Sequence, residues 1–467
     1  MIEKGLLPEY PKEVQSELKK IEKPAATRKG TRDKTDLLWV SIDNIDSLDL
    51  DQLTYAEKIS NEKDRIYIAV ADVDALVKNG SAIDLCARHN TTSVYTPGRV
   101  FAMLPPKLST NLTSLNENEE RSAIVIEMDI DKDGRFELHD LYPARVRNKA
   151  KLVYENVAEW LEMHQRMEPF SEEIHAQLKL QDTIARRIHS FRVDQGALGF
   201  DTIELQAVMI AKIAVRLEPR KVNQAHRLIE NYMIAANVGA TQYLKQHDLP
   251  VLQRVVRKPK RWSRIMLVAK ELGDHLPTNP NVKALRDFLV RQQLKNPQDF
   301  HDLSLTIIKL IGKGEYVMGL PGKQSIGHFD LALHDYAHTT APNRRYPDLI
   351  MQRLLKSQLF QERVPYNQKE LSALAKHCTE KEDDATKVER RMIKCAAAMV
   401  MKDQIGQRFP ALVTGAGRKG TWVRLYDPPV EGRVVRGCGN LDVGDHIKVE
   451  LLSVNIRKGH IDFKGCL

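Results

Sequence analysis

Cysteine is scarce in this chain of 467 residues, and its copies are scattered (Cys86, Cys378, Cys395, Cys438 and Cys466). Their odd number and the lack of a CxxC spacing argue against a disulfide framework and a structural zinc site. The chain also lacks a run of about 18 apolar residues that could cross a bilayer, and an apolar signal core near its start. We therefore expect reduced thiols, no membrane insertion and a cytoplasmic location.

The charge of the chain is positive, with a formal net charge of +9 and a pI of about 9.1. Such a balance suits a polyanionic partner, although many basic proteins bind none. The charge therefore indicates RNA or DNA as a candidate partner without choosing between them.

The first half of the chain divides into an arm and a sheet. Residues 1–36 are polar and rich in lysine, with one possible helix at 11–21, and we interpret them as a leader arm. Residues 37–146 have the pattern of a sheet, with strands expected at 37–42, 64–73 and 122–130.

Helical periodicity dominates residues 154–311 and returns in a second block at 347–407. After residue 409, short alternating strands with glycine-rich turns fit a small five-stranded OB barrel. The pattern predicts an α+β fold followed by a small all-β domain.

Carboxylates are densest in the segment VSIDNIDSLDLDQ, which carries Asp43, Asp46, Asp49 and Asp51. Residues two apart in an extended segment face the same side, so Asp49 and Asp51 can converge, and Asp43 can return to them across the turn. Mg²⁺ or Mn²⁺ accepts such oxygen ligands. A solvated acidic loop explains these residues as well, whereas an EF-hand is excluded by the missing glycine and terminal glutamate.

Two arginines, Arg344 and Arg345, stand directly before an amphipathic helix in YAHTTAPNRRYPDLIMQRLL. The positive end of a helix reinforces an anion site, and the arginine fork can hold phosphate at two points. The alternative is an ordinary helix entry, with Asp348 in the first turn and surface arginines.

Two other patterns resemble known motifs but do not fit them. His334 and His338 lie four apart, yet the first has no adjacent glutamate as in metalloproteases, so structural histidines are favoured. The segment 415–420 matches GxGxxG but is followed by another strand, which favours an OB hairpin over a dinucleotide fold.

Three aromatic residues lie in or beside turn-like sequence: Tyr95, Tyr154 and Phe200. Each ring could stack on a base, worth ~1–3 kcal/mol, although each alone is more often part of a core. The basic run at 254–261 fits either phosphate contacts or a solvated connector.

Together these segments resemble the RNB catalytic domain of the ribonuclease II and ribonuclease R family. The resemblance covers roughly residues 36–405 in the family's order, and the tail resembles an OB fold of the ribosomal-protein S1 type. It implies a leader arm at 1–36, an RNB domain at 37–406 with a mixed sheet and helices around an RNA channel, and an OB domain at 407–467.

The resemblance implies hydrolytic 3′-to-5′ digestion of single-stranded RNA to 5′-mononucleotides with Mg²⁺, or Mn²⁺, as cofactor. Asp43, Asp49 and Asp51 correspond to the family's metal-holding and water-orienting acids. Arg344 corresponds to the arginine that grips the scissile phosphate, with Arg345 beside it.

Further roles follow from the same resemblance. Glu389 corresponds to a helix glutamate near the substrate 3′ end, and Glu230 to one near the terminal ribose. Tyr95 and Phe200 would clamp the terminal bases, while Tyr154 would stack further along and help to set the shortest product.

The chain departs from the family pattern in three places. Gln52 stands where the family usually has aspartate, so the acidic cluster loses a charge but keeps a carbonyl oxygen that could serve as a metal ligand. Asn343 stands where the family commonly has isoleucine. The first 36 residues cannot contain the family's cold-shock domains, so we expect weaker RNA binding and lower processivity.

Two alternatives to an exoribonuclease stay open. Because of Gln52, the chain could be a catalytically impaired RNA-binding protein. A metal phosphoesterase acting on DNA or nucleotides would share the acidic cluster.

Overall fold

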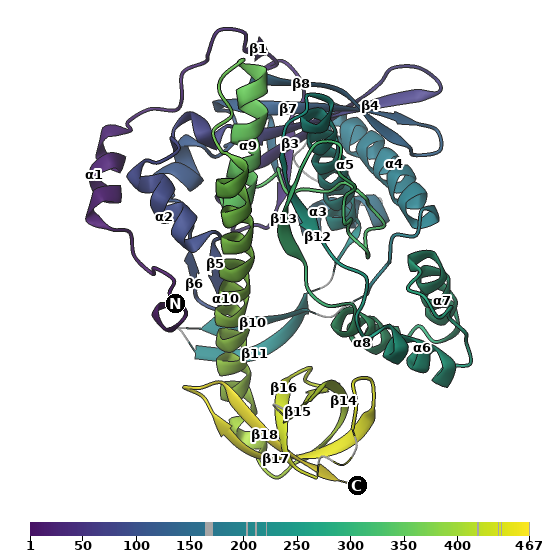
Figure 1. The fold of residues 1–467 in the computed structure, drawn as a ribbon. Coiled ribbons are helices and arrows are strands. Elements are labelled where there is room, and N and C mark those ends of the chain that lie inside the picture. Colours follow the sequence, from purple (N-terminus) through teal and green to yellow (C-terminus); the bar gives the residue numbers. More distant parts are fainter. Residues whose placement is uncertain are drawn as a thin grey trace.

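A mixed seven-stranded sheet forms the upper layer of the molecule (Figure 1). The computed structural model describes residues 1–163, 171–201, 204–210, 213–220, 222–417, 420–437, 439 and 441–466. The strand order is β1-β8-β7-β4-β3-β2-β9, antiparallel except for the pairs β1–β8 and β2–β9. The strands are β1 (Arg32–Asp33), β2 (Val40–Asp43), β3 (Gln52–Lys58), β4 (Lys63–Ala71), β7 (Glu120–Asp131), β8 (Phe136–Arg147) and β9 (Ala150–Val153).

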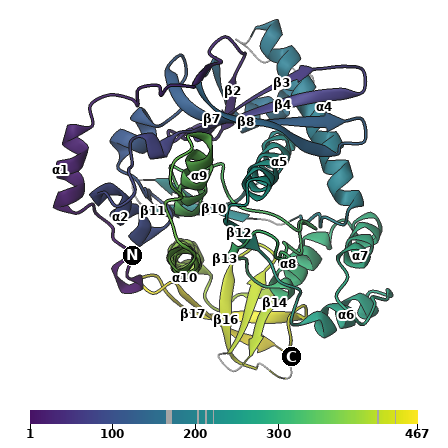
Figure 2. The ribbon, with the colours of Figure 1, turned by 45° about the horizontal axis from the view of Figure 1, so that its top comes forward.

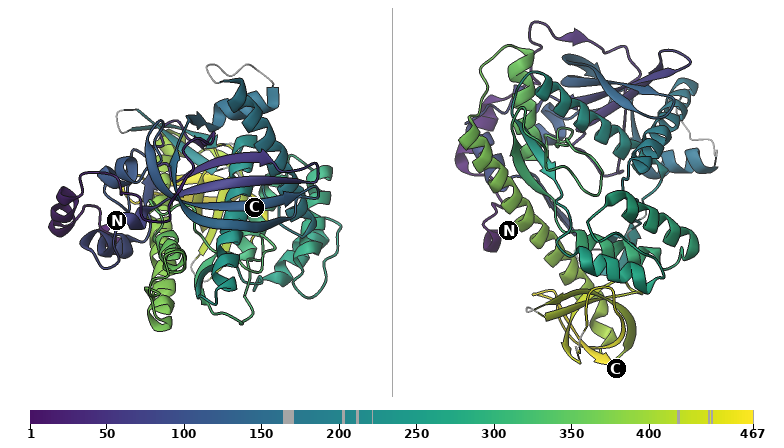
Figure 3. Two further views of the ribbon diagram at one scale, coloured as in Figure 1. Left: turned by 90° about the horizontal axis from the view of Figure 1, so that it is seen from above. Right: turned by 45° about the vertical axis from the view of Figure 1, so that its right-hand side comes forward.

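Helices lie beneath this sheet in the right-hand view of Figure 3: α3 (Tyr154–Met163), α4 (Glu172–Asp194) and α5 (Gln224–Gln246). Helix α4 is bonded to β3, where Thr54 Oγ1 donates to Gln181 Oε1 at 2.8 Å. Helix α5 approaches β7 so closely that a Cβ atom on Gly239 would lie 2.4 Å from the Met128 sulfur. Glycine therefore permits the close packing of this layer.

Helix α9 (Tyr346–Leu359) is buried over most of its length, and Gln352 of α9 donates to the carbonyl of Ala71 at the end of β4 at 2.8 Å. Helix α10 (Gln368–Met401) runs down the molecule to the C-terminal domain (Figure 1). Three shorter helices lie to one side in Figure 2 and have a hydrophobic cluster of their own: α6 (Trp262–Glu271), α7 (Val282–Lys295) and α8 (Phe300–Ile311).

The C-terminal strands close into a barrel in the order β14-β15-β16-β18-β17. They are β14 (Arg408–Gly417), β15 (Gly420–Leu425), β16 (Glu431–Arg436), β17 (His446–Asn455) and β18 (His460–Cys466). Ala397, Ala398 and Met401 at the end of α10 join the buried core of the barrel. The predicted α+β fold with a small five-stranded barrel is confirmed.

The N-terminal arm packs against the domain that follows it. Helix α1 (Lys12–Lys20) covers the predicted helix at 11–21, and its Val14 belongs to the main core. Strand β1 pairs with β8, and α2 (Ala82–Asn90) accepts the arm through Asn90, whose Oδ1 receives the Leu7 N–H at 2.8 Å. The arm is thus an integral part of the fold.

The prediction that helices dominate residues 154–311 was wrong for two segments. Strands β10 (Glu204–Ile210) and β11 (Ile213–Arg220) form a hairpin, and β12 (Val251–Val255) pairs with β13 (Glu315–Gly319). Short apolar runs of this length do not distinguish strand from helix. For β12 the pairing partner also lies far along the chain.

The four cysteines within the described ranges are free thiols, and Cys438 lies outside those ranges. In the same ranges, no helix combines the length and apolar character needed to cross a membrane.

Candidate active site

The acidic segment lies between two neighbouring strands of the sheet. Asp43 ends β2 and Gln52 begins β3, so the loop between them starts and finishes at the sheet. The carbonyl of Asp51 accepts the Ala71 N–H at 2.9 Å, which joins Asp51 to β4. Only 2% of Asp51 is exposed, whereas Asp46 in the middle of the loop is exposed.

The loop before α9 reaches this acidic segment from far along the chain. The Asn343 N–H donates to Asp51 Oδ1 at 2.9 Å, and Arg344 Nε lies 3.4 Å from Asp51 Oδ2. The carbonyl of Arg344 accepts the Ser93 N–H at 3.0 Å. A guanidinium group and a buried carboxylate are therefore held side by side.

The carboxylates share an environment that disfavours their charge. Burial raises the pKa of Asp43 to about 6 and that of Asp51 to about 8, and it raises the pKa of Asp49. Arg344 lowers the pKa of all three, and the charge of Asp49 raises the pKa of the other two. The structure thus brings together the three aspartates and the arginine that the sequence singled out.

This donor set fits a hard divalent cation. Asp51 Oδ2 is buried and makes no hydrogen bond to the described residues. A bound cation would offset the charge of acids whose pKa is raised, and oxygen ligands suit Mg²⁺ or Mn²⁺. Within the described ranges, no three histidine, cysteine or acidic side chains form a ready-made metal cluster. The identity of the metal ligands stays a prediction.

Tyr95 lies beside the acidic cluster. It belongs to the hairpin of β5 (Val94–Thr96) and β6 (Arg99–Phe101), and its side chain is partly exposed. Burial raises its pKa to about 12, with opposing effects of Arg344 and of Asp49 and Asp51. The Tyr95 N–H donates to Glu389 Oε1 of α10 at 2.8 Å, so this glutamate also reaches the site.

Comparisons with known proteins show the family of the chain. A family model described as the RNB domain matches residues 31–361. The chain belongs to the RNB-domain family. A second model, the RNase II-type exonuclease C-terminal S1 domain, matches residues 407–464, where the barrel lies. The resemblance drawn from the sequence is confirmed.

Ribonuclease R from Thermotoga maritima is 32% identical to the RNB-family chain over 443 residues, which cover 91% of this chain and 61% of the relative. The chain thus spans about three-fifths of the length of this curated relative.

Two solved structures share the fold. Mycoplasma genitalium RNase R in complex with ribose-methylated single-stranded RNA has a TM-score of 0.88 at 24% identity, covering 100% of this chain and 77% of that one. Yeast Ssd1, described as a pseudonuclease, has a TM-score of 0.69 at 19% identity, covering 88% of this chain and 52% of that one.

Other residues with expected RNB-family roles lie in different surroundings. The Tyr154 ring stacks on His226, with centroids 3.9 Å apart and planes 10° apart. Phe200 packs against the hydrophobic cluster of α6, α7 and α8. The exposed Glu230 of α5 lies 3.9 Å from Arg192 Nη1. Their contacts with RNA stay predictions.

Arg345 is held inside the RNB domain. Its Nη2 donates to Asp348 Oδ1 at 2.7 Å, and Asp348 Oδ1 also accepts the Ala341 N–H at 2.8 Å. Asp348 thus stands in the first turn, as in the helix entry that the sequence left open, but Arg345 is largely buried and not the surface arginine of that alternative. Nearby, His338 Nδ1 lies 2.9 Å from the Tyr316 hydroxyl, as expected of a structural histidine.

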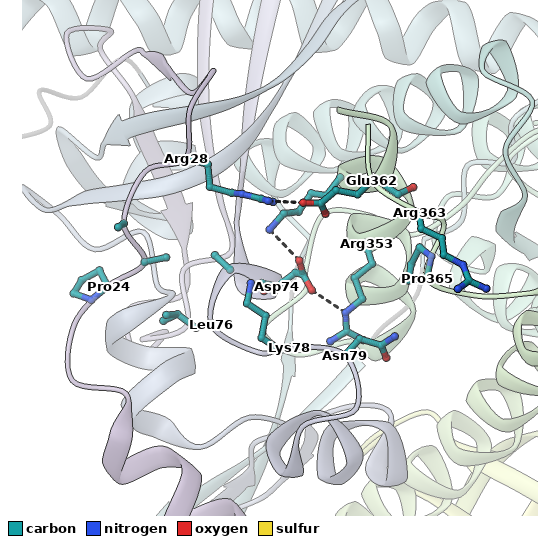
Figure 4. A pocket seen from close by; sticks show the side chains of 15 residues that line it. Pro24, Arg28, Asp74, Leu76, Lys78, Asn79, Arg353, Glu362, Arg363 and Pro365 are labelled. Atoms are coloured by element: carbon teal, nitrogen blue, oxygen red, sulfur yellow. Dashed lines mark hydrogen bonds and ion pairs between the residues drawn. The ribbon is translucent and has the colours of Figure 1, made fainter. Parts of the chain in front are cut away.

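A cavity of about 680 Å³ lies apart from this RNB-family site, between the N-terminal arm and the C-terminal part of α9 (Figure 4). None of the predicted site residues lines it. Asp74 in its wall is bonded to Arg353 at 2.9 Å and to Lys356 at 3.0 Å, so these buried charges are paired.

Sequence reasoning missed the residues that join the two loops of the site. Directly after η3 (Leu108–Leu112), Thr113 contacts the loop of Arg344 and Ser114 contacts the acidic loop. No sequence pattern indicates either contact. Asn343 had a signal in its departure from the family pattern, but only the structure shows its contacts.

Proposed function

We propose that the chain is a hydrolytic 3′-to-5′ exoribonuclease that degrades single-stranded RNA to 5′-mononucleotides. The observation that carries the proposal is the pairing of Arg344 with Asp51 inside a cluster of buried carboxylates. The family and the relative named ribonuclease R support the same reaction class.

In this proposal Mg²⁺, or Mn²⁺ in its place, would be held by the carboxylates of Asp43, Asp49 and Asp51 and by the side-chain carbonyl of Gln52. The metal ion, when bound, supplies positive charge that stabilises the transferring phosphate. Its ligands would be ionised in the loaded enzyme because the cation favours their charged form.

Arg344 binds the scissile phosphate and offsets the charge that grows on it in the transition state. This requires the guanidinium to shift from Asp51, and the 3.4 Å separation in the structure is looser than a good hydrogen bond. Asp51 Oδ2, which is without a hydrogen bond in the described ranges, accepts a hydrogen bond from the attacking water and so orients it.

The 3′ end of the strand lies near Tyr95 and Glu389 in this proposal. The Tyr95 ring stacks on a terminal base with Phe200, and Glu389 positions the end of the strand. Glu230 contacts the terminal ribose, and Tyr154 stacks further along. Stacking tolerates any base, and contacts to the 2′-OH favour RNA over DNA.

A gel time course tests the reaction. Single-stranded RNA labelled at its 5′ end is incubated with Mg²⁺ or Mn²⁺, beside an EDTA control, an Asp51→Asn variant and DNA of the same sequence. We expect a metal-dependent ladder that shortens from the 3′ end to a stub of a few nucleotides, absent with Asp51→Asn and with DNA. Intact RNA with either metal overturns the proposal.

A second candidate is an RNA-binding protein with impaired catalysis. It is favoured by Gln52 at a position where the family has aspartate, and a protein described as a pseudonuclease shares the fold. Gln52→Asp separates the two functions. A large gain from a near-zero wild-type rate supports the second, and a robust wild-type rate ends it.

A further inference from the structure

Asn343 connects the two loops of the candidate site through its backbone. It directly precedes Arg344, and only 1% of it is exposed. Its N–H donates to Asp51 Oδ1 at 2.9 Å. The orientation of Asn343 therefore affects both the acid it bonds and the arginine that follows it.

The Asn343 side chain is fixed by a residue far away in the sequence. Thr113 Oγ1 donates to Asn343 Oδ1 at 2.6 Å, and 4% of Thr113 is exposed. The pair is closed to water, so neither group has solvent as an alternative partner. Loss of the Thr113 hydroxyl would leave the Asn343 amide buried without this bond, whereas Thr113 without Asn343 can still donate to the Leu108 carbonyl, 2.9 Å away.

The residues after Thr113 hold the acidic loop in the same way. Ser114 Oγ donates to the Leu48 carbonyl at 2.9 Å and accepts the Leu50 N–H at 2.9 Å. The Leu115 N–H donates to the Leu50 carbonyl at 2.9 Å. These bonds flank Asp49, so the segment 113–115 contacts both the acidic loop and the loop of Arg344.

The hydrogen-bonding groups of the Asn343 side chain are only partly satisfied. Its Nδ2 is buried and makes no hydrogen bond to the described residues, which is unfavourable in an interior. An apolar side chain of similar size would avoid this cost. The amide adds the bond to Thr113.

We propose that Thr113 and Asn343 are positioning residues, which keep the Asn343 N–H on Asp51 and Arg344 beside that acid. This inference rests on the proposed hydrolysis for its kinetic consequence, but the geometry it describes does not. Neither side chain acts on substrate itself in this proposal.

A double-mutant cycle tests the pair, with Thr113→Val, Asn343→Ile and both together. Thr113→Val strands the buried Asn343 amide, and Asn343→Ile removes the bond that ties residue 343 to Thr113, whereas the double variant replaces both by apolar groups. We expect each single change to lower kcat about tenfold or more with KM altered less than about twofold, and the double variant to recover most of the loss.

Two further variants serve as controls. Thr113→Ser keeps the hydroxyl and is expected to stay within about twofold of wild type. Thr183→Val removes a hydroxyl from the exposed face of α4, where Thr183 donates to the Lys179 carbonyl at 2.8 Å, and should change nothing. The proposal that Thr113 and Asn343 act together is overturned if the single variants keep the wild-type kcat or change KM alone. It is also overturned if the double variant is no more active than the worse single variant.

A second readout does not depend on hydrolysis. Mn²⁺ affinity, measured by electron paramagnetic resonance without RNA, should fall severalfold in each single variant and return in the double variant. If the wild type binds Mn²⁺ but does not cleave RNA, the proposed function fails while the cycle still tests the positioning. Equal Mn²⁺ affinity in the wild type and all three variants overturns the proposed positioning role.

Discussion

Replacing Asp51 by asparagine should stabilise the metal-free protein while abolishing its activity. Only 2% of Asp51 is exposed, and burial raises its pKa from 3.8 to about 8. The folded protein therefore holds the carboxyl proton of Asp51 more tightly than the unfolded chain does. At neutral pH the unfolded chain is stabilised by ionising this carboxyl group, whereas the folded protein still holds it mostly protonated, so folding loses stability that an uncharged amide does not lose.

The size of the effect follows from the difference in pKa. At pH 7 the destabilisation is about 4 kcal/mol, since each pH unit above 3.8 contributes about 1.4 kcal/mol until the folded pKa is reached. The new amide N–H₂ finds no evident acceptor at Oδ2, which costs about 1–3 kcal/mol. We expect a net gain of about 1–3 kcal/mol, or a Tm higher by about 1–4 °C in a domain of this size.

The sign of the pH dependence is part of the prediction. The folded pKa lies above the unfolded one, so the wild type loses stability as pH rises from about 4 to 8. The advantage of Asp51→Asn should be absent near pH 4, grow through this window and level off above it. Mg²⁺ should raise the Tm of the wild type but not that of the variant, because a ligand stabilises only the state that binds it.

Differential scanning fluorimetry in EDTA across pH 5–8 measures this dependence. Asp46→Asn, in the exposed middle of the same loop, is the matched control and should leave Tm unchanged at every pH. An Asp51→Asn protein that is less stable than the wild type at pH 8, or an advantage that does not grow with pH, refutes the reasoning.

Three further predictions concern single side chains. Arg344→Lys keeps the charge but loses the two-point grip, so single-turnover hydrolysis should slow about 100-fold with little change in RNA affinity; an unchanged rate removes Arg344 from the mechanism. Lys356→Met should cost about 3–5 kcal/mol in urea unfolding because it leaves the buried Asp72 without its ion pair and Asp74 with Arg353 alone, whereas Lys376→Met on the surface should cost nothing measurable. Tyr95→Ala should weaken binding of short RNA by about 1–3 kcal/mol in fluorescence anisotropy, and equal binding of both proteins excludes stacking there.

The sequence predicts those features that depend on local pattern. The barrel strands alternate and have turns between them, and the acids from the end of β2 to the start of β3 stand at a spacing that lets them converge. Helices α4 and α5 have long apolar periodicity, and both formed near the expected residues. In each case neighbours in the sequence determine the outcome.

The features that the sequence could not predict depend on partners far along the chain. Tyr154 faces His226, which no pattern around residue 154 indicates. Arg345 has the same residue type and helix position as Arg344, yet Asp348 holds it in the turn. Thr113 and Asn343 are separated by 230 residues, so only the folded chain shows that they meet.

The most direct test of the proposed reaction is the fate of solvent oxygen. Defined single-stranded RNA is digested with Mg²⁺ in water enriched in ¹⁸O, and the released nucleotides are examined by mass spectrometry over time. We predict 5′-monophosphates that each carry one ¹⁸O atom and appear in order from the 3′ end. Products without ¹⁸O, nucleotides with 3′ or cyclic phosphates, or release from the 5′ end would contradict hydrolytic 3′-to-5′ digestion.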